Sequence, residues 1–225
     1  MNQFVKIEDC IIAITERGKL YKYDFDGKLL WETETNAYCH SNPASNGKII
    51  VFGNDNGEII SVNSASGKIL YRKLIGSAFS SGTVIYEDAL FLGDSDGKFY
   101  SINLIDGKIN WIFYSSARIC TEAIAENDVI YFGNLKGEFF KISKANGIVV
   151  WRINTDGLLN ITPLLTKNIL ILPDENRKLY FISTENGAIL DRINLDGRMK
   201  LNPVIRNNLL FIGYENGNLK AYEIQ

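Results

Sequence analysis

Short apolar runs recur along the chain at a spacing of about 40 residues, with turn-forming residues between them. One set is apolar at almost every position and covers residues 49–52, 90–92, 129–132, 169–172 and 209–212. These runs are about four residues long and rich in β-branched and aromatic residues. They therefore predict strands that are buried on both faces, rather than helices.

Three further sets of runs complete each repeat. A more alternating set follows the buried one and covers residues 20–23, 99–102, 139–142 and 179–182. A third set ends in a large aromatic residue, as at residues 29–31 and 149–151. A fourth begins each unit near Pro43, Pro163 and Pro203, where proline is tolerated as the first residue of a strand. Each unit is thus expected to hold four strands joined by tight hairpins.

Glycines and aromatic residues follow the same period. The turn glycines are Gly27, Gly67, Gly107, Gly147 and Gly187. Two more columns read Gly57, Gly97, Gly137, Arg177, Gly217 and Gly53, Gly93, Gly133, Pro173, Gly213. Four residues after each turn glycine stand Trp31, Tyr71, Trp111, Trp151 and Asp191. This agreement between independent columns indicates an internal repeat.

A four-stranded antiparallel unit of this length cannot bury both of its faces alone, but blades packed radially around an axis cover one another. The fold class predicted is therefore all-β, a β-propeller of about six four-stranded antiparallel blades whose last blade lacks its outer strand. We expect a single domain over residues 1–225. The blades are expected at about residues 1–33, 42–73, 82–113, 122–153, 162–193 and 202–225.

The run from Gly93 to Trp111, with its spaced glycines, Gly-Lys turn and tryptophan, resembles the pyrroloquinoline-quinone-type (PQQ-like) propeller repeat. That family includes quinoprotein dehydrogenases and non-catalytic scaffolds similar to the propeller lipoprotein of the bacterial outer-membrane assembly machine. The resemblance implies that Trp31, Trp111 and Trp151, with Tyr71 as a substitute, pack on the glycine turn of a neighbouring blade. Asp191 breaks this column, so weaker contacts are expected there.

Composition and charge argue against some classes of function. The formal charge of −2 provides no general attraction to nucleic acid. No apolar run is long enough for a transmembrane segment, and the first residues lack the pattern of a secretory signal. The chain as written is thus expected in the cytoplasm, or in the periplasm if a signal peptide has been removed. Cys10, Cys39 and Cys120 have neither disulfide nor zinc spacing.

Enzymes of the quinoprotein class carry adjacent cysteines beside the quinone, and this chain has no Cys-Cys pair. Turns such as residues 54–57 resemble calcium loops, but Asn63 stands where the final glutamate of such a loop would be. Asx residues also stabilise tight turns through their own backbone, which suffices here. We therefore expect no cofactor, no metal and no catalytic residues.

Polar groups gather in the segments that join one predicted blade to the next. In a propeller these segments surround one mouth of the central channel. The candidate binding residues at this mouth are His40, Arg118, Glu122, Asn160, Arg198 and Lys200. The arginines and the lysine favour an acidic partner. His40 has no evident carboxylate neighbour in the sequence, so acid–base chemistry is not indicated.

The function expected is a non-catalytic binding or scaffold module for protein or peptide partners, and the alternative is a quinone- or sugar-binding enzyme of the quinoprotein class. Two modes of binding are open. A partner could dock at the channel mouth, or a partner strand could add to the last blade around residues 219–224.

Overall fold

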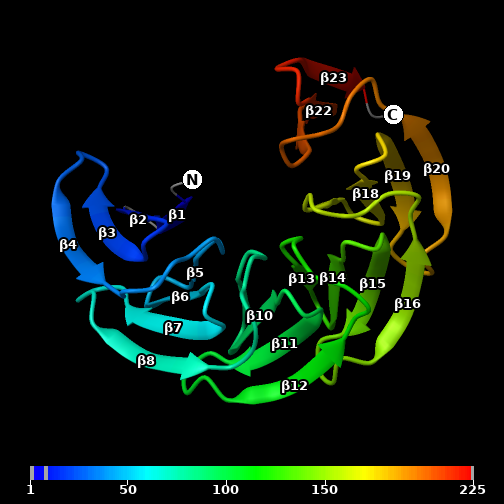
Figure 1. Cartoon of the computed structure of the whole chain (residues 1–225). Helices are drawn as coiled ribbons and strands as arrows, with labels where there is room; N and C mark the ends of the chain where they lie inside the picture. The colour runs from blue at the N-terminus through cyan, green and yellow to red at the C-terminus, as the bar shows by residue number, and fades with distance from the viewer. Residues whose placement is uncertain (1–2, 8–9, 224–225) are drawn as a thin grey trace. The chain divides into compact units, whose positions relative to one another are not determined.

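The computed structural model describes residues 3–7 and 10–223, and all of its regular elements are β-strands (Figure 1). Sheet 1 contains β1 (Gln3–Ile7), β2 (Cys10–Ile14), β3 (Lys19–Asp24) and β4 (Leu29–Glu34). Sheet 2 contains β5 (Ala44–Ser45), β6 (Ile49–Gly53), β7 (Glu58–Asn63) and β8 (Ile69–Leu74). Sheet 3 contains β9 (Val84–Tyr86), β10 (Ala89–Gly93), β11 (Lys98–Asn103) and β12 (Ile109–Tyr114).

The second half repeats this plan. Sheet 4 contains β13 (Ile124–Glu126), β14 (Val129–Gly133), β15 (Glu138–Ser143) and β16 (Val149–Asn154). Sheet 5 contains β17 (Leu164–Leu165), β18 (Ile169–Pro173), β19 (Lys178–Ser183) and β20 (Ile189–Asn194). Sheet 6 contains β21 (Val204–Arg206), β22 (Leu209–Gly213) and β23 (Leu219–Glu223). Within each described sheet, every strand pairs antiparallel with its neighbour in sequence, so the sheet is a meander with its first strand at one edge. Residue 224, part of the segment that the sequence singled out for strand addition, lies outside the described residues.

Two compact units divide the chain, Met1–Ala123 with sheets 1 to 3 and Ile124–Gln225 with sheets 4 to 6. Within each unit the core lies between consecutive sheets. In the first unit Ile12 and Leu20 of sheet 1 pack with Phe52 and Ile60 of sheet 2. In the second unit Tyr131 of sheet 4 belongs to the same cluster as residues of sheet 5. The second strands of sheets 2 to 5 are buried on both faces, as their apolar runs predicted. The same prediction for residues 209–212 was wrong for one face, because β22 alternates between buried and half-buried positions.

A β-bulge interrupts the outer strand of each of the first five sheets. In sheet 4, Trp151 faces Lys141 while Val149 faces Ile142, so Val150 is the extra residue. Sheets 1, 2, 3 and 5 shift register at the equivalent point. A bulge disrupts the ladder and twists the strand locally, which discourages further pairing at an exposed edge.

The glycine column at the turn before each third strand is required by geometry. Gly57 has a φ of +80°, and a Cβ built on it would lie 1.9 Å from the carbonyl oxygen of Gly76. Gly97 and Gly137 are similarly crowded by backbone carbonyls. Arg177 occupies this column in sheet 5 and retains the left-handed conformation, with a φ of 62°. A non-glycine residue in this conformation is strained.

Candidate functional site

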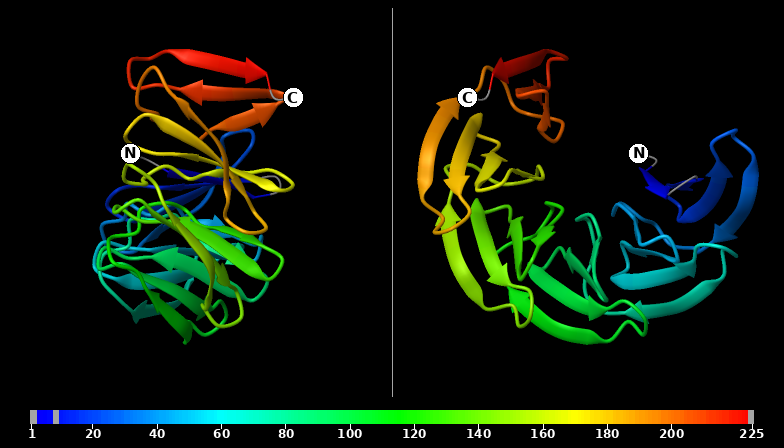
Figure 2. Two further views of the ribbon diagram at one scale, coloured as in Figure 1. Left: turned by 90° about the vertical axis from the view of Figure 1, so that its right-hand side faces the viewer. Right: turned by 180° about the vertical axis from the view of Figure 1, so that it is seen from behind.

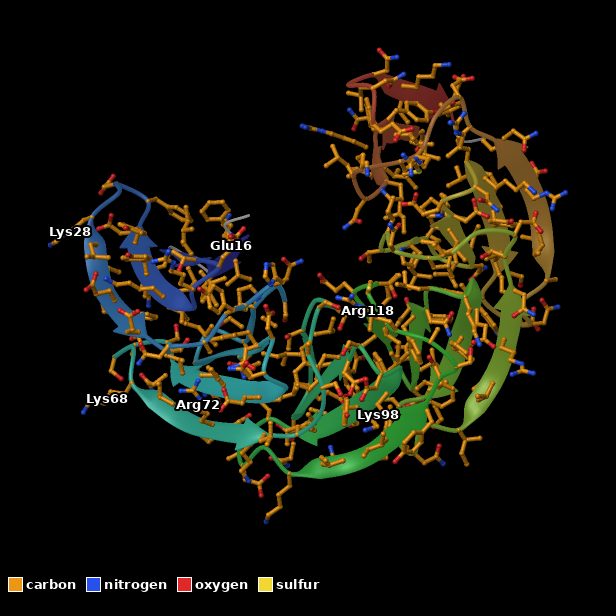
Figure 3. All side chains as sticks on the ribbon, viewed as in Figure 1. Glu16, Lys28, Lys68, Arg72, Lys98 and Arg118 are labelled. Carbon is orange, nitrogen blue, oxygen red and sulfur yellow. The ribbon has the colours of Figure 1, made fainter. Side chains whose placement is uncertain are left out.

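The predicted mouth residues lie in the connections between the outer strand of one sheet and the first strand of the next. His40, Arg118 and Glu122 belong to the first unit, and Asn160, Arg198 and Lys200 belong to the second. Figure 3 shows Arg118 on the side of the first strands, whereas Lys28 and Lys68 project from turns beside the outer strands. The connections therefore carry a set of polar side chains distinct from those of the outer turns.

His40 has a carboxylate neighbour that the sequence did not reveal. Its Nδ1 lies 2.7 Å from Oδ2 of Asp55, which follows β6. The expectation that His40 lacks such a neighbour was therefore wrong. The backbone explains the pairing, because the amide of Asp55 donates to the carbonyl of Tyr38 at 2.9 Å and holds the turn against the connection.

An equivalent contact in sheet 5 joins an asparagine to a glutamate, where the first unit joins a histidine to an aspartate. Asn160 Nδ2 donates to Oε1 of Glu175 at 2.6 Å, and the amide of Glu175 donates to the carbonyl of Leu158. Asn160 and Glu175 are 15 residues apart, as are His40 and Asp55. This recurring offset is the signal from which the Asp55 contact could have been found.

The side chain of Glu122 lies in the connection before sheet 4. It passes Gly82, in the connection before sheet 3, and reaches Asn42, in the connection before sheet 2. Its Oε2 accepts from Nδ2 of Asn42 at 3.3 Å, and a Cβ on Gly82 would lie 2.3 Å from the same oxygen. A glycine at position 82 thus leaves room for the carboxylate to pass. Burial raises the pKa of Glu122, and the hydrogen bond from Asn42 opposes that shift.

Arg118 is held by a hydroxyl group, not by an acid. Its Nε donates to Oγ of Ser80 at 3.2 Å, and Ser80 also lies 3.8 Å from Sγ of Cys120. Within the described residues no ion pair is formed by Arg118, whose guanidinium thus keeps an uncompensated charge.

Arg198 in the second unit is compensated by two acids. Its Nη2 lies 2.7 Å from Oε2 of Glu215, and its Nη1 lies 3.5 Å from Oε2 of Glu175. The hydrogen bond from Arg198 lowers the pKa of Glu215, and the pKa of Arg198 is raised in turn. The charge of Arg198 is thus compensated by two acids of its own unit.

The aromatic column makes contacts between neighbouring sheets within each unit. Trp31 Nε1 donates to the carbonyl of Ser64 at 3.0 Å, and a Cβ on Gly67 would lie 2.9 Å from its ring. Trp151 Nε1 donates to the carbonyl of Thr184 at 3.2 Å, over the turn that contains Gly187.

Tyr71 stands in the aromatic column in place of a tryptophan and makes an equivalent hydrogen bond to the next sheet. Its hydroxyl donates to the carbonyl of Leu104 at 3.0 Å, and burial raises the pKa of Tyr71 to about 12. Trp111 packs beside Phe91 and Phe99 of its own sheet.

Over residues 3–7 and 10–223, no group of three or more His, Cys, Asp or Glu side chains is placed to hold a metal ion. No helix long and apolar enough to cross a membrane occurs in the same described residues. The site consists of polar side chains paired across connections and turns.

The fold defines the class of protein, which is a β-propeller. BamB from Moraxella catarrhalis matches 98% of this chain and 71% of its own, with a TM-score of 0.79 and 16% identity. The computationally designed Ika8 protein matches 99% of this chain and 71% of its own, with a TM-score of 0.86 and 13% identity. The predicted propeller of about six blades is thereby confirmed.

A family model described as "Outer membrane protein assembly factor BamB" matches residues 5–118 and 114–225. The chain therefore belongs to this family of PQQ-like repeat propellers, and the resemblance to its non-catalytic scaffold members is confirmed. No curated protein matched the sequence.

Proposed function

We propose that this chain is a non-catalytic platform that binds protein or peptide partners during the assembly of outer-membrane proteins. The observation that carries the proposal is the family match, which extends over nearly the whole chain and is described as an assembly factor. Such a role implies a periplasmic location.

The connections are suited to recognising a partner. Their side chains are already ordered by pairs such as His40 with Asp55 and Arg198 with Glu215, so little conformational entropy is lost on binding. Arg118 and Lys200 supply the cationic groups that an acidic segment would contact. We therefore assign the partner site to His40, Arg118, Glu122, Asn160, Arg198 and Lys200.

Site-specific photo-crosslinking tests this proposal. A photoreactive residue is placed at position 118 or 200, and a matched control is placed at Lys68 on an outer turn. Each protein is mixed with a periplasmic and outer-membrane fraction, and the crosslinked products are identified by mass spectrometry. We expect one protein to crosslink from both connection positions but not from position 68.

The double variant Arg118→Ala with Arg198→Ala provides the second arm. Used as a competitor, it should displace the crosslinked partner less effectively than the wild-type protein does. Equal crosslinking from all three positions, or none from positions 118 and 200, would reject the platform site. Thermal stabilisation by pyrroloquinoline quinone with calcium would instead favour the quinoprotein alternative.

A further inference from the structure

Arg177 holds a strained position in the turn between β18 and β19. The equivalent turns of sheets 2 to 4 carry a glycine there. The φ of Arg177 is 62°, in the same left-handed region as the φ of +80° at Gly57. This conformation costs an arginine free energy that it does not cost a glycine. Strained positions of this kind cluster at active sites and ligand contacts, so Arg177 is a candidate for a binding role.

The turn of sheet 5 also gives this side chain room that the other turns lack. Gly57, Gly97 and Gly137 are buried, and a Cβ on them would lie 1.9, 2.7 and 2.5 Å from a carbonyl oxygen of the following connection. Arg177 is exposed instead. The amide of Leu195 still donates to the carbonyl of Arg177 at 2.7 Å, a bond that the equivalent residues of sheets 2 to 4 also make. The connection therefore stays attached to the turn while the arginine side chain lies at the surface.

The connection from β20 to β21 joins sheet 5 to sheet 6 within the second unit and carries two more cationic residues, Arg198 and Lys200 (Figure 2). Its start is bonded to Arg177, as described above. Further along, the amide of Glu215 donates to the carbonyl of Arg198 at 2.9 Å. The amide of Lys200 donates to the carbonyl of Gly213 at 3.1 Å. The backbone thus brings the turn that contains Arg177 and the connection that contains the other two cations together.

These three cationic side chains surround one carboxylate, that of Glu215. Arg198 forms ion pairs with both Glu215 and Glu175. The hydrogen bond from Arg198 is the main cause that lowers the pKa of Glu215, and the nearby charges of Arg177 and Lys200 lower it further. In the part of the chain that the structure describes, neither Arg177 nor Lys200 forms an ion pair of its own.

The balance of charge at this cluster favours one more anionic group. Both glutamates are already bound by Arg198, so the charges of Arg177 and Lys200 stay available. Asp196, the acid of the same connection, is paired with Lys220. A carboxylate that reached Arg177 and Lys200 would accept charge-assisted hydrogen bonds, which are about twice as strong as those between neutral groups. Arginine also matches the planar geometry of a carboxylate.

We infer that Arg177 and Lys200 form a binding site for the carboxylate of an acidic side chain in a peptide partner, beside the ion pair of Arg198 with Glu215. Glu175 and Glu215 would repel a doubly charged phosphate more strongly than a singly charged carboxylate, so the carboxylate is the preferred ligand. This inference rests on the proposed platform function. It deepens that proposal by adding Arg177, which the sequence did not single out for binding, and by naming the group that it recognises.

The probe for this site is the synthetic peptide acetyl-Ser-Asp-Gly-Glu-Ser-amide. The matched control peptide carries Asn and Gln in place of Asp and Glu, and therefore has the same shape without the charge. Each peptide is titrated into the ¹⁵N-labelled protein at low ionic strength, and the backbone and arginine Nε signals are followed by NMR. We expect saturable changes at Arg177 and Lys200 with the acidic peptide and none with the control peptide.

Two substitutions of Arg177 separate its charge from its strain. Arg177→Gln removes the charge and keeps a side chain in the left-handed conformation, whereas Arg177→Gly removes the charge and the strain together. Both should weaken binding of the acidic peptide about two- to fivefold, and only Arg177→Gly should raise the midpoint of urea unfolding. Lys68→Gln removes the same charge from an outer turn of the first unit and is the matched control, with unchanged affinity expected.

The inference would be overturned by equal affinity of Arg177→Gln and the wild-type protein for the acidic peptide, or by equal signal changes with the two peptides. Tighter binding of inorganic phosphate than of the acidic peptide at Arg177 would also overturn it. The crosslinking experiment keeps the two proposals apart. If Arg177→Gln competes for the crosslinked partner as well as the wild-type protein does, the platform stands and this site is rejected. Peptide binding at Arg177 without any crosslinked partner would support the site and reject the platform.

Discussion

Replacement of Trp151 by alanine should destabilise the second unit by about 4 kcal/mol. The indole is 9% exposed, donates to the carbonyl of Thr184, and packs beside Tyr131 and Phe139. Loss of a buried tryptophan side chain costs about 3–5 kcal/mol, of which the hydrogen bond contributes about 1 kcal/mol. Trp151→Phe keeps most of the ring burial, so it should cost about 1–2 kcal/mol.

A double-mutant cycle with Gly187 isolates the contact between the sheets. Gly187→Ala places a Cβ 2.9 Å from the indole at a φ of +75°, so it carries both a steric and a backbone penalty. In the Trp151→Ala background the steric part disappears, and about 1 kcal/mol of backbone penalty remains.

Urea unfolding and thermal unfolding, both followed by far-UV circular dichroism, measure these costs. A loss of about 4 kcal/mol corresponds to a fall in Tm of about 8–16 °C for a chain of this size. Additive effects of Trp151→Ala and Gly187→Ala would refute the docking argument. So would a cost below about 1 kcal/mol for Trp151→Ala.

Four further results are expected. Gly57→Ala should cost more than 3 kcal/mol in urea unfolding, because its Cβ meets a backbone carbonyl, whereas Gly27→Ala, with no atom within 4 Å, should cost about 1 kcal/mol; similar costs would contradict the crowding argument. Arg177→Gly should stabilise the protein by about 1 kcal/mol by relieving the left-handed strain, and an unchanged urea midpoint would show that no strain is stored there. Hydrogen bonding to Arg72 lowers the pKa of Glu58, so the stabilisation of the folded state by Glu58 is complete above its unfolded pKa of about 4.3 and is lost as pH falls through the lower folded pKa. Arg72→Ala should therefore reduce the change in the free energy of unfolding between pH 5 and pH 3. Burial raises the pKa of Cys39 to about 12, so iodoacetamide at pH 8 should leave Cys39 unmodified in the folded protein, and mass spectrometry would reveal any early labelling.

Much of the fold could be predicted because its signals are local and periodic. The buried runs, the turn glycines and the aromatic column each depend on neighbours within one repeat, so a period of about 40 residues defines the sheets. The candidate site was predicted less completely. His40 was identified without Asp55, and Arg198 without Glu175 and Glu215, since these contacts join a connection to a turn on a different strand pair.

The sequence by itself determined the order and register of the strands, because alternation, turn chemistry and glycine positions act over a few residues. Only the tertiary structure decided which polar groups meet. Glu122 reaches Asn42, 80 residues earlier, across the space that Gly82 leaves, and such a contact depends on how sheets pack within the unit.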